Sequence, residues 1–260
     1  MLRRNILTLA TALIVMLALG ACRHGEPKGE KVDTDSIVVD TTATLGDAPN
    51  APRCNVHVVF HYAKGENAQT INDSLLRSGI LTPDYLAMEE GHLDPRNAVR
   101  TFARRYVEDY QRDGQLILGQ EPDYAELNWT YAAETKVERY RKGTIAYIAT
   151  VTAYEGGSQP TTVTIVRNID TTTGRILGLA DVLLPGADKT LLDEVVKELC
   201  KRNDVNELAE LQQKGCFVGI EPYLPDNFIA ADDDIVFIYQ PGEIAATEMG
   251  EIRVTVENIK

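Results

Sequence analysis

The chain has 260 residues and a formal net charge of −13 at pH 7. Hydrophobic residues make up 44% and charged residues 25% of the sequence, which is the composition of an ordinary globular protein. A surface this acidic repels phosphate backbones and anionic lipid headgroups, so we do not expect nucleic acid binding. It attracts cationic partners, although the same charge also serves solubility.

The N-terminus has the parts of a secretory signal. Two arginines precede an apolar stretch over residues 6–19, which is shorter than the roughly 20 residues that a membrane-spanning helix needs. The stretch ends in Leu-Gly-Ala before Cys22 and resembles the lipobox of bacterial lipoproteins. The resemblance implies a signal peptide over residues 1–21 and a Cys22 that carries lipid, including an amine-linked acyl chain such as palmitate. The alternative is an ordinary cleaved signal followed by an incidental cysteine.

Removal of the signal leaves a net charge of −15, because residues 1–21 contain two arginines and no acid. Arg23 follows the cysteine, where an aspartate would favour retention in the inner membrane. We therefore expect a protein of the cell envelope that contacts the membrane only through its lipid anchor, at the outer membrane.

Residues 22–52 are polar and rich in glycine, proline, threonine and acids, with Ile37-Val38-Val39 as their one apolar run. This composition predicts a disordered tether. A flexible segment of about 30 residues has a root-mean-square reach of roughly 30 Å.

An ordered α+β pattern begins after the tether. β-branched and aromatic residues predict a strand over residues 55–62. Ile71 and Leu75 share one face of a helix predicted over residues 67–80. A second helix is predicted from Asp94-Pro95 to Gly114, with a core face of Ala98, Phe102, Tyr106 and Tyr110.

The rest of the chain alternates with period two around one helical segment. Strands are predicted over residues 127–140, 144–155, 161–169, 217–220, 235–240 and 251–257. Asp170 and Gly174 predict a turn, in which the carboxylate caps and the glycine supplies a positive φ. A helix is expected from Asp188, continued or repeated over residues 205–211. The grouping of helices and strands predicts an α+β fold of antiparallel sheets with helices packed on one face.

The sequence offers no recognisable catalytic or metal site. His57 and His61 have the spacing of a helical zinc pair, but on a strand they lie roughly 13 Å apart and cannot share one ion. No nucleotide-binding or nucleophile motif occurs, so we predict no cofactor and assign no catalytic residue. Trp129 and Tyr131 fall on one strand face, where core packing is the favoured interpretation and stacking on a sugar is the alternative.

Cys54, Cys200 and Cys216 remain after Cys22 is assigned to lipid. Cys200 and Cys216 flank a short helical stretch and are predicted to form a disulfide, which stabilises a loop of that length by about 3 kcal/mol. The alternative is buried free thiols that act as small hydrophobes.

Three stretches resemble a known extracellular domain. Residues 155–160, Glu-Gly-Gly-Ser-Gln-Pro, and residues 168–183 are similar to a Gly-Gly turn and an Asn-x-Asp…Thr-Gly-x-x-Leu-x-Leu-x-Asp stretch of the RsiV-type extracellular domain. Residues 238–257 match its closing hairpin. The first strand and the Ile71-Asn72 helix resemble the domain that precedes it, which also occurs in PdaC-type peptidoglycan deacetylases. The resemblance implies a PdaC/RsiV-type α+β region over residues 53–158 and an RsiV-like α+β region over residues 159–260.

RsiV-type domains bind lysozyme on behalf of an anti-sigma factor. The resemblance implies a lipid-anchored binding module that is not an enzyme and that engages a cationic lysozyme-like protein or peptidoglycan. Without the relatives' membrane span, sigma-binding segment or deacetylase domain, we expect neither sigma regulation by that route nor deacetylation. Gln159 stands where the family often has histidine, and Gly242 and Thr247 where it often has tyrosines. The alternative is an envelope glycan hydrolase, which needs two carboxylates that face each other across a cleft.

Overall fold

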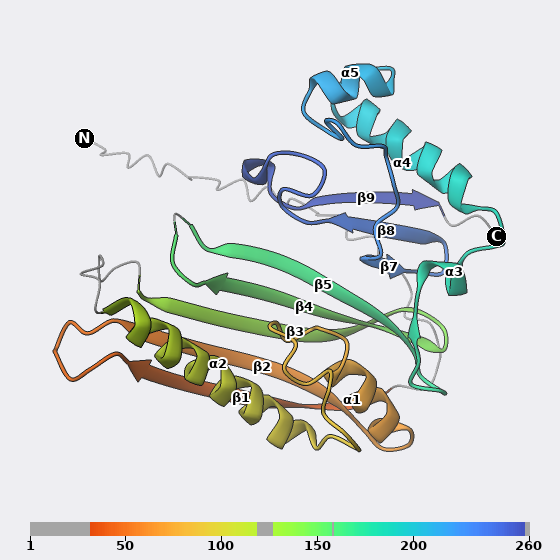
Figure 1. The fold of residues 1–260 in the computed structure, drawn as a ribbon. Helices are drawn as coiled ribbons and strands as arrows, with labels where there is room; N and C mark the ends of the chain where they lie inside the picture. Colours follow the sequence, from red (N-terminus) through yellow and green to blue (C-terminus); the bar gives the residue numbers. More distant parts are fainter. Residues whose placement is uncertain (1–31, 119–126, 158, 258–260) are drawn as a thin grey trace, which may run out of the picture.

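The computed structural model describes residues 32–118, 127–157 and 159–257. The predicted signal peptide and Cys22 lie outside these residues. Two sheets organise the described chain (Figure 1), one with the strand order β1-β2-β3-β4-β5-β6 and one with the order β7-β8-β9. Helices are grouped on these mainly antiparallel sheets, and the predicted α+β fold class is confirmed.

The strands and helices of the described residues have the following bounds. The first sheet consists of β1 (Asp33–Thr44), β2 (Arg53–Lys64), β3 (Trp129–Arg141), β4 (Thr144–Tyr154), β5 (Thr161–Asp170) and β6 (Ile176–Leu177). The second sheet consists of β7 (Phe228–Ala230), β8 (Asp234–Tyr239) and β9 (Ile252–Glu257). The helices are α1 (Ala68–Leu76), α2 (Pro95–Leu118), α3 (Leu179–Val182), α4 (Asp188–Arg202), α5 (Leu208–Gln213) and the 3₁₀ turn η1 (Thr247–Met249).

Helices α1 and α2 cover one face of the first sheet (Figure 1). They form the crossover between β2 and β3, the parallel pair of this sheet, and a parallel pair requires a crossover of this kind. The predicted core face of α2 is confirmed, because Ala98, Phe102, Tyr106 and Tyr110 are all at most 5% exposed.

The second sheet packs on the opposite face of the first. Strand β4 is buried on both sides, because Tyr147 belongs to the core under α2 while Ile148 packs with Val166, Ile229 and Ile238 between the two sheets. Helices α4 and α5 lie beyond the second sheet (Figure 1), and α4 packs against β9. The order of layers is therefore helix, sheet, sheet, helix.

Strand β1 corrects the predicted tether. The disordered segment was expected to reach Pro52, but Asp33–Thr44 pairs with β2 along its whole length. Only Ile37 is fully buried in this edge strand, and its other positions alternate between exposed and half-buried. Because an edge strand is held mainly by backbone pairing, it needs little apolar content, and its composition resembled that of a linker.

Gly114 does not end α2, as the glycine signal predicted. The helix continues to Leu118, and a Cβ at Gly114 would overlap the side chain of Leu45. The glycine is therefore explained by the close approach of the β1–β2 connection to the helix.

Two further predicted elements differ from the structure. Helix α1 was predicted to reach residue 80 but ends at Leu76. After its end, the Ser78 hydroxyl donates to the Leu75 carbonyl at 2.7 Å, and Gly79 has a φ of +71°, which is not helical. Residues 217–220 form a turn in place of the predicted strand, since Phe217 has a φ of +54°. The sequence patterns also missed the short β6, α3, β7 and η1.

The predicted boundary between residues 158 and 159 does not separate the two sheets. Strands β4 and β5 lie on either side of it and pair from Thr144↔Asp170 to Ala153↔Thr161, and the first sheet ends only at Leu177. None of the helices in the described parts of the chain is long and apolar enough to cross a membrane.

Candidate functional site

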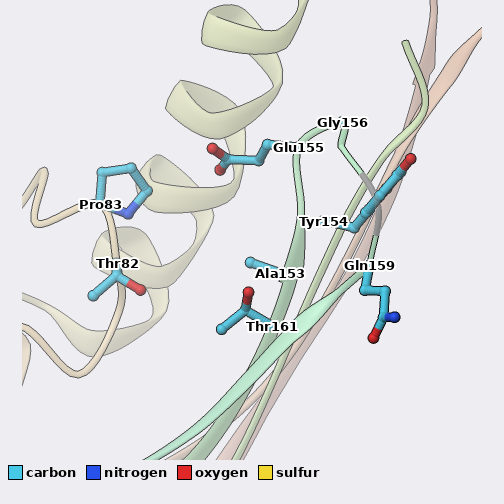
Figure 2. Close-up of a pocket in the computed structure, with 8 residues that line it drawn as sticks. All are labelled: Thr82, Pro83, Ala153, Tyr154, Glu155, Gly156, Gln159 and Thr161. Carbon is cyan, nitrogen blue, oxygen red and sulfur yellow. The ribbon is translucent and has the colours of Figure 1, made fainter. Parts of the chain in front are cut away.

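Two adjoining cavities lie where β4 ends and β5 begins. The first, the Glu155 cavity, has a volume of about 380 Å³ and is lined by Thr82, Pro83, Ala153, Tyr154, Glu155, Gly156, Gln159 and Thr161 (Figure 2). The second, the Glu248 cavity, has a volume of about 720 Å³ and is lined by Gln159, Pro160, Thr161, Thr162, Thr164, Pro241, Thr247, Glu248, Gly250 and Glu251. Gln159 and Thr161 line both cavities, and we call the two adjoining cavities together the β5 groove.

Glu155 is held at its end of the groove by the core of the first layer. Its carboxylate accepts a hydrogen bond of 2.8 Å from the hydroxyl of Tyr106, a residue of α2 that is 1% exposed. Burial, with the nearby Glu155 as a further cause, raises the pKa of Tyr106. The phenol therefore stays a neutral donor, and Figure 2 shows the carboxylate pointing from the end of β4 toward α2, on the side of Pro83.

Further tyrosines surround this carboxylate. Burial is the main cause of the raised pKa of Tyr85 and Tyr131, and the charge of Glu155 contributes to both. The Tyr85 hydroxyl donates to Asp109 at 2.5 Å, and the Tyr131 hydroxyl accepts from the Thr82 amide at 3.2 Å. The hydroxyls of Tyr85 and Tyr131 thus already have hydrogen-bond partners. The Glu155 carboxylate lines the cavity and can accept further hydrogen bonds there.

The favoured interpretation of Trp129 and Tyr131 as core residues is confirmed. Tyr131 is 1% exposed, with its ring centroid 5.0 Å from that of Tyr106, and Trp129 packs 5.5 Å from the ring of Tyr110. Tyr131 belongs to the core under α2, and the partly buried Trp129 packs against that core.

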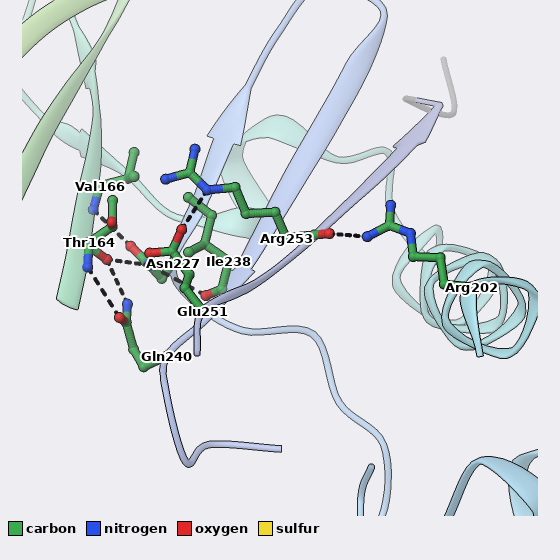
Figure 3. A network of polar contacts seen from close by, with 8 residues as sticks. All are labelled: Thr164, Val166, Arg202, Asn227, Ile238, Gln240, Glu251 and Arg253. Carbon is green, nitrogen blue, oxygen red and sulfur yellow. Dashed lines mark hydrogen bonds and ion pairs between the residues drawn. The ribbon is translucent and has the colours of Figure 1, made fainter. Parts of the chain in front are cut away.

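The Glu248 cavity lies between β5 and the connection from β8 to β9. Its β5 wall carries hydroxyls, and the Oγ1 atoms of Thr162 and Thr152 lie 2.9 Å apart. The opposite wall carries Glu248, which is exposed, and Glu251, whose carboxylate is paired with Arg253 at 2.5 Å (Figure 3).

The three positions at which this sequence departs from the RsiV-type pattern gather at the Glu248 cavity. Gln159 and Thr247 line it. Gly242 has a φ of +82°, and a Cβ there would lie 2.9 Å from the Thr247 hydroxyl. Residues that are far apart in the sequence therefore meet at one place, which sequence patterns alone did not indicate.

The two acids of this cavity are on the same wall. Glu248 and Glu251 come from one connection, three positions apart, and the β5 wall opposite them contributes threonines and Gln159. A glycosidase places its acid and its second carboxylate on either side of the scissile bond. The lining residues of the β5 groove are suited to hold a cation or hydrogen-bonding groups at several points.

The four histidines do not form a metal site in the parts of the chain that the structure describes, and no group of metal-ligating side chains occurs there. His57 lies on β2, where its Nδ1 is 2.6 Å from Asp40 of β1, and the Nδ1 of His61 is 3.2 Å from the Thr135 hydroxyl. His24 is outside the described residues.

The predicted disulfide between Cys200 and Cys216 is not formed. Both residues and Cys54 are buried free thiols. Cys200 and Cys216 belong to the apolar core between α4, α5 and the second sheet, and burial raises the pKa of both thiols. They act as small hydrophobes, which was the alternative interpretation.

Comparison with known proteins identifies the C-terminal region. Residues 180–258 match the family described as "Protein of unknown function (DUF3298)". No curated protein matches the chain. A crystal structure of a DUF3298 family member from Bacteroides fragilis NCTC 9343 is similar, with a TM-score of 0.74 and 23% identity over 87% of this chain and 90% of that one.

A crystal structure of a DUF3298 family protein from Pseudomonas aeruginosa PAO1 is also similar, with a TM-score of 0.58 and 12% identity over 88% of this chain and 91% of that one. At these identities the likeness shows the fold alone. The second sheet and the helices α4 and α5 that cover it lie within residues 180–258, the part of the chain that matches the DUF3298 family model.

Proposed function

We propose that this protein is a non-catalytic binding module of the cell envelope that engages a cationic protein through the β5 groove. The observation that carries the proposal is the placement of carboxylates at both ends of one groove, Glu155 at one end and Glu248 with Glu251 at the other. The net charge of −13 adds a long-range attraction for a basic partner.

The local structure supports binding by a fixed acidic site. Glu155 is oriented by the buried Tyr106 hydroxyl, and Glu251 by Arg253, so these carboxylates are held before a partner arrives. Preorganised groups lose less conformational freedom on binding, which favours affinity. Among the ion pairs of the described residues, Glu155 and Glu248 have none, so a partner's lysine or arginine meets unpaired charge.

Lysozyme is the specific candidate, and the resemblance to the RsiV-type domain supplies it. The departures at Gln159, Gly242 and Thr247 all lie at the Glu248 cavity. If relatives contact their ligand at this cavity, the contact here is made by different side chains, and a basic protein other than lysozyme then fills the groove.

A glycan hydrolase is the weaker alternative. Its two carboxylates must flank the scissile bond, whereas Glu248 and Glu251 share one wall of their cavity. Peptidoglycan as a bound, uncleaved ligand fits the threonine hydroxyls of β5 and the ring of Tyr154 in the Glu155 cavity, but it does not use the acidic charge of the groove.

The proposal places the module on a lipid anchor at Cys22. Strand β1 begins at Asp33, eleven residues after this cysteine, rather than after a tether that extends to Pro52. A segment of that length holds the folded part within about 40 Å of its anchor even when fully extended.

The test is surface plasmon resonance of the full-length chain over immobilised lysozyme at low and high salt. Steering by opposite charges predicts an on-rate that falls several-fold as salt is added, because the Debye length shrinks from about 10 Å at 0.1 M to about 3 Å at 1 M. The off-rate should change less.

Glu155→Gln and Glu248→Gln should each weaken binding about two- to fivefold, as expected for a partly exposed charge pair. Glu66→Gln is the matched control, since Glu66 is exposed in the turn after β2 and outside the groove. Equal effects of all three variants would mean that net charge alone drives the interaction, and would reject the β5 groove as the binding site. Absence of micromolar binding at low salt would reject lysozyme as the partner.

A further inference from the structure

Strand β5 has an edge that the first sheet leaves largely uncovered. On one side β5 pairs with β4 over its full length, from Thr161 to Asp170. On the other side the short β6 pairs only with Asn168 and Ile169. Among the residues that the structure describes, no strand pairs with the edge from Thr161 to Arg167.

Side-chain amides replace the missing strand in the middle of this edge (Figure 3). Gln240 brackets Thr164, because its Oε1 accepts from the Thr164 amide at 3.2 Å and its Nε2 donates to the Thr164 carbonyl at 2.6 Å. Asn227 accepts from the Val166 amide at 2.7 Å and also donates to the Thr164 carbonyl at 2.8 Å. The outward-facing backbone groups of β5 therefore have hydrogen-bond partners from Thr164 onward.

Thr162 is left open at the start of the same edge. Backbone groups of a strand alternate in direction with a period of two residues. The amides of Thr164 and Val166 point outward, so the N–H and C=O of Thr162 point outward as well. No partner for them occurs among the described residues, and the Thr162 hydroxyl is already engaged with Thr152.

This open position lies in the Glu248 cavity. Thr161, Thr162 and Thr164 line the cavity on the β5 side, and Glu248 and Glu251 line it on the other side. The depression of about 720 Å³ therefore combines an unpaired strand edge with carboxylates facing it.

We infer that the β5 groove takes an extended, basic peptide segment of its partner, which pairs with the main chain of Thr162 as an added strand. The inference rests on the proposed function, because Glu248 and Glu251 select the charge of the occupant. Main-chain pairing supplies the hydrogen bonds, and alternate side chains of the segment reach the carboxylates. A glycan lacks the main-chain N–H and C=O that pair with Thr162 in this way.

The first test uses a capped peptide of alternating lysine and valine residues as the probe. It is titrated into the nitrogen-15-labelled full-length chain, and amide hydrogen exchange is followed by NMR. The Thr162 amide should become protected on binding. The Val163 amide, which points toward β4, should change little.

The second test examines the backbone of the peptide. N-methylation removes one donor at a time. Because Thr162 offers the one open carbonyl of this edge among the described residues, methylation at the single position that pairs with it should weaken binding about tenfold, and methylation elsewhere should change binding little. Uniform small effects along the peptide would overturn strand addition.

Variants of the protein give a matched pair. Thr162→Pro removes the outward N–H without removing a bond to β4, and proline is tolerated at strand edges, so binding should fall about tenfold. Thr162→Val keeps the backbone groups and should bind within about twofold of the unmodified chain. Should Thr162→Pro not fold, the N-methyl series decides the question.

The outcomes separate the two proposals. Glu248→Gln should weaken binding of the lysine peptide without changing which single position is sensitive to N-methylation. Binding that depends on Glu248 but has no such sensitive position would overturn strand addition and leave the cationic partner in place. A peptide that does not bind at low salt, or that binds equally well with glutamate in place of lysine, would overturn both.

Discussion

Loss of the Asn227 side chain should destabilise this fold measurably. Asn227 joins the edge of β5 to the second sheet through hydrogen bonds to Val166, Thr164 and Ile238, at 2.7, 2.8 and 3.4 Å (Figure 3). In Asn227→Ala the Thr164 carbonyl keeps its bond to Gln240, and the Val166 amide loses its partner.

The magnitude follows from these contacts. Val166 is 2% exposed, so its orphaned amide is buried between the sheets and costs about 1–3 kcal/mol. The lost bond to Thr164 adds about 1 kcal/mol, and the bond of 3.4 Å to Ile238 adds little. We expect the free energy of unfolding to fall by about 2–4 kcal/mol, and the Tm by roughly 5–15 °C for a domain of this size.

Urea and thermal unfolding of the full-length chain, followed by circular dichroism, measure this loss. Asn206→Ala is the control, since Asn206 is exposed after α4 and only its backbone amide makes a described hydrogen bond. A loss below about 0.5 kcal/mol would refute the reasoning, because such a value is typical of an ordinary surface substitution. Separate transitions for the two sheets would also contradict it, since this contact should couple them into one cooperative unit.

Further predictions concern stability, pH and the lipid anchor. Gly114→Ala should destabilise the fold by about 1–3 kcal/mol, because overlap with Leu45 outweighs a helix-propensity gain of about 1 kcal/mol. In a double-mutant cycle, Leu45→Ala should relieve part of this loss. A Gly114→Ala variant that is more stable than the unmodified chain would contradict the close approach of Leu45 to the helix. The pKa of Asp170 is lowered chiefly by the Thr173 amide, so its contribution is complete above the unfolded pKa of about 3.9 and is lost as the pH falls through the lower native value. The stability difference between the unmodified chain and Asp170→Asn should accordingly shrink from about pH 6 to about pH 2, and a constant difference in urea titrations would speak against it. An alkyne fatty acid should label the unmodified protein and not Cys22→Ser, and equal labelling of both would remove the lipid anchor from the proposal.

Much of the fold followed from local patterns. The core face of α2 was predicted correctly because Ala98, Phe102, Tyr106 and Tyr110 recur at helical spacing. The turn after β5 was predicted from Asp170 and Gly174, and the Asp170 carboxylate indeed accepts from the Thr172 and Thr173 amides while Gly174 has a φ of +68°. Such features depend on neighbours within a few residues, which the sequence displays directly.

Strand β1 and the end of α2 were mispredicted because their causes are distant. Asp33–Thr44 is a strand because β2 supplies its hydrogen bonds, and its own polar composition resembles a linker. Gly114 signalled a helix end, but it serves the approach of Leu45, a residue far away in the sequence. Propensity was overridden by tertiary contact in both places.

The sequence by itself determined the α+β class, the acidic charge that favours a cationic partner, and most strand and helix positions, since periodicity and composition are local properties. Only the tertiary structure decided the candidate site. It brought Glu155, Gln159 and Glu248 to one groove, packed Trp129 and Tyr131 against α2, and kept Cys200 and Cys216 as separate thiols. It also left Thr162 as the open position of an edge that Asn227 and Gln240 otherwise close. These outcomes depend on which strands pair and which faces pack, and pairing between residues far apart in the chain leaves no periodic trace in the sequence.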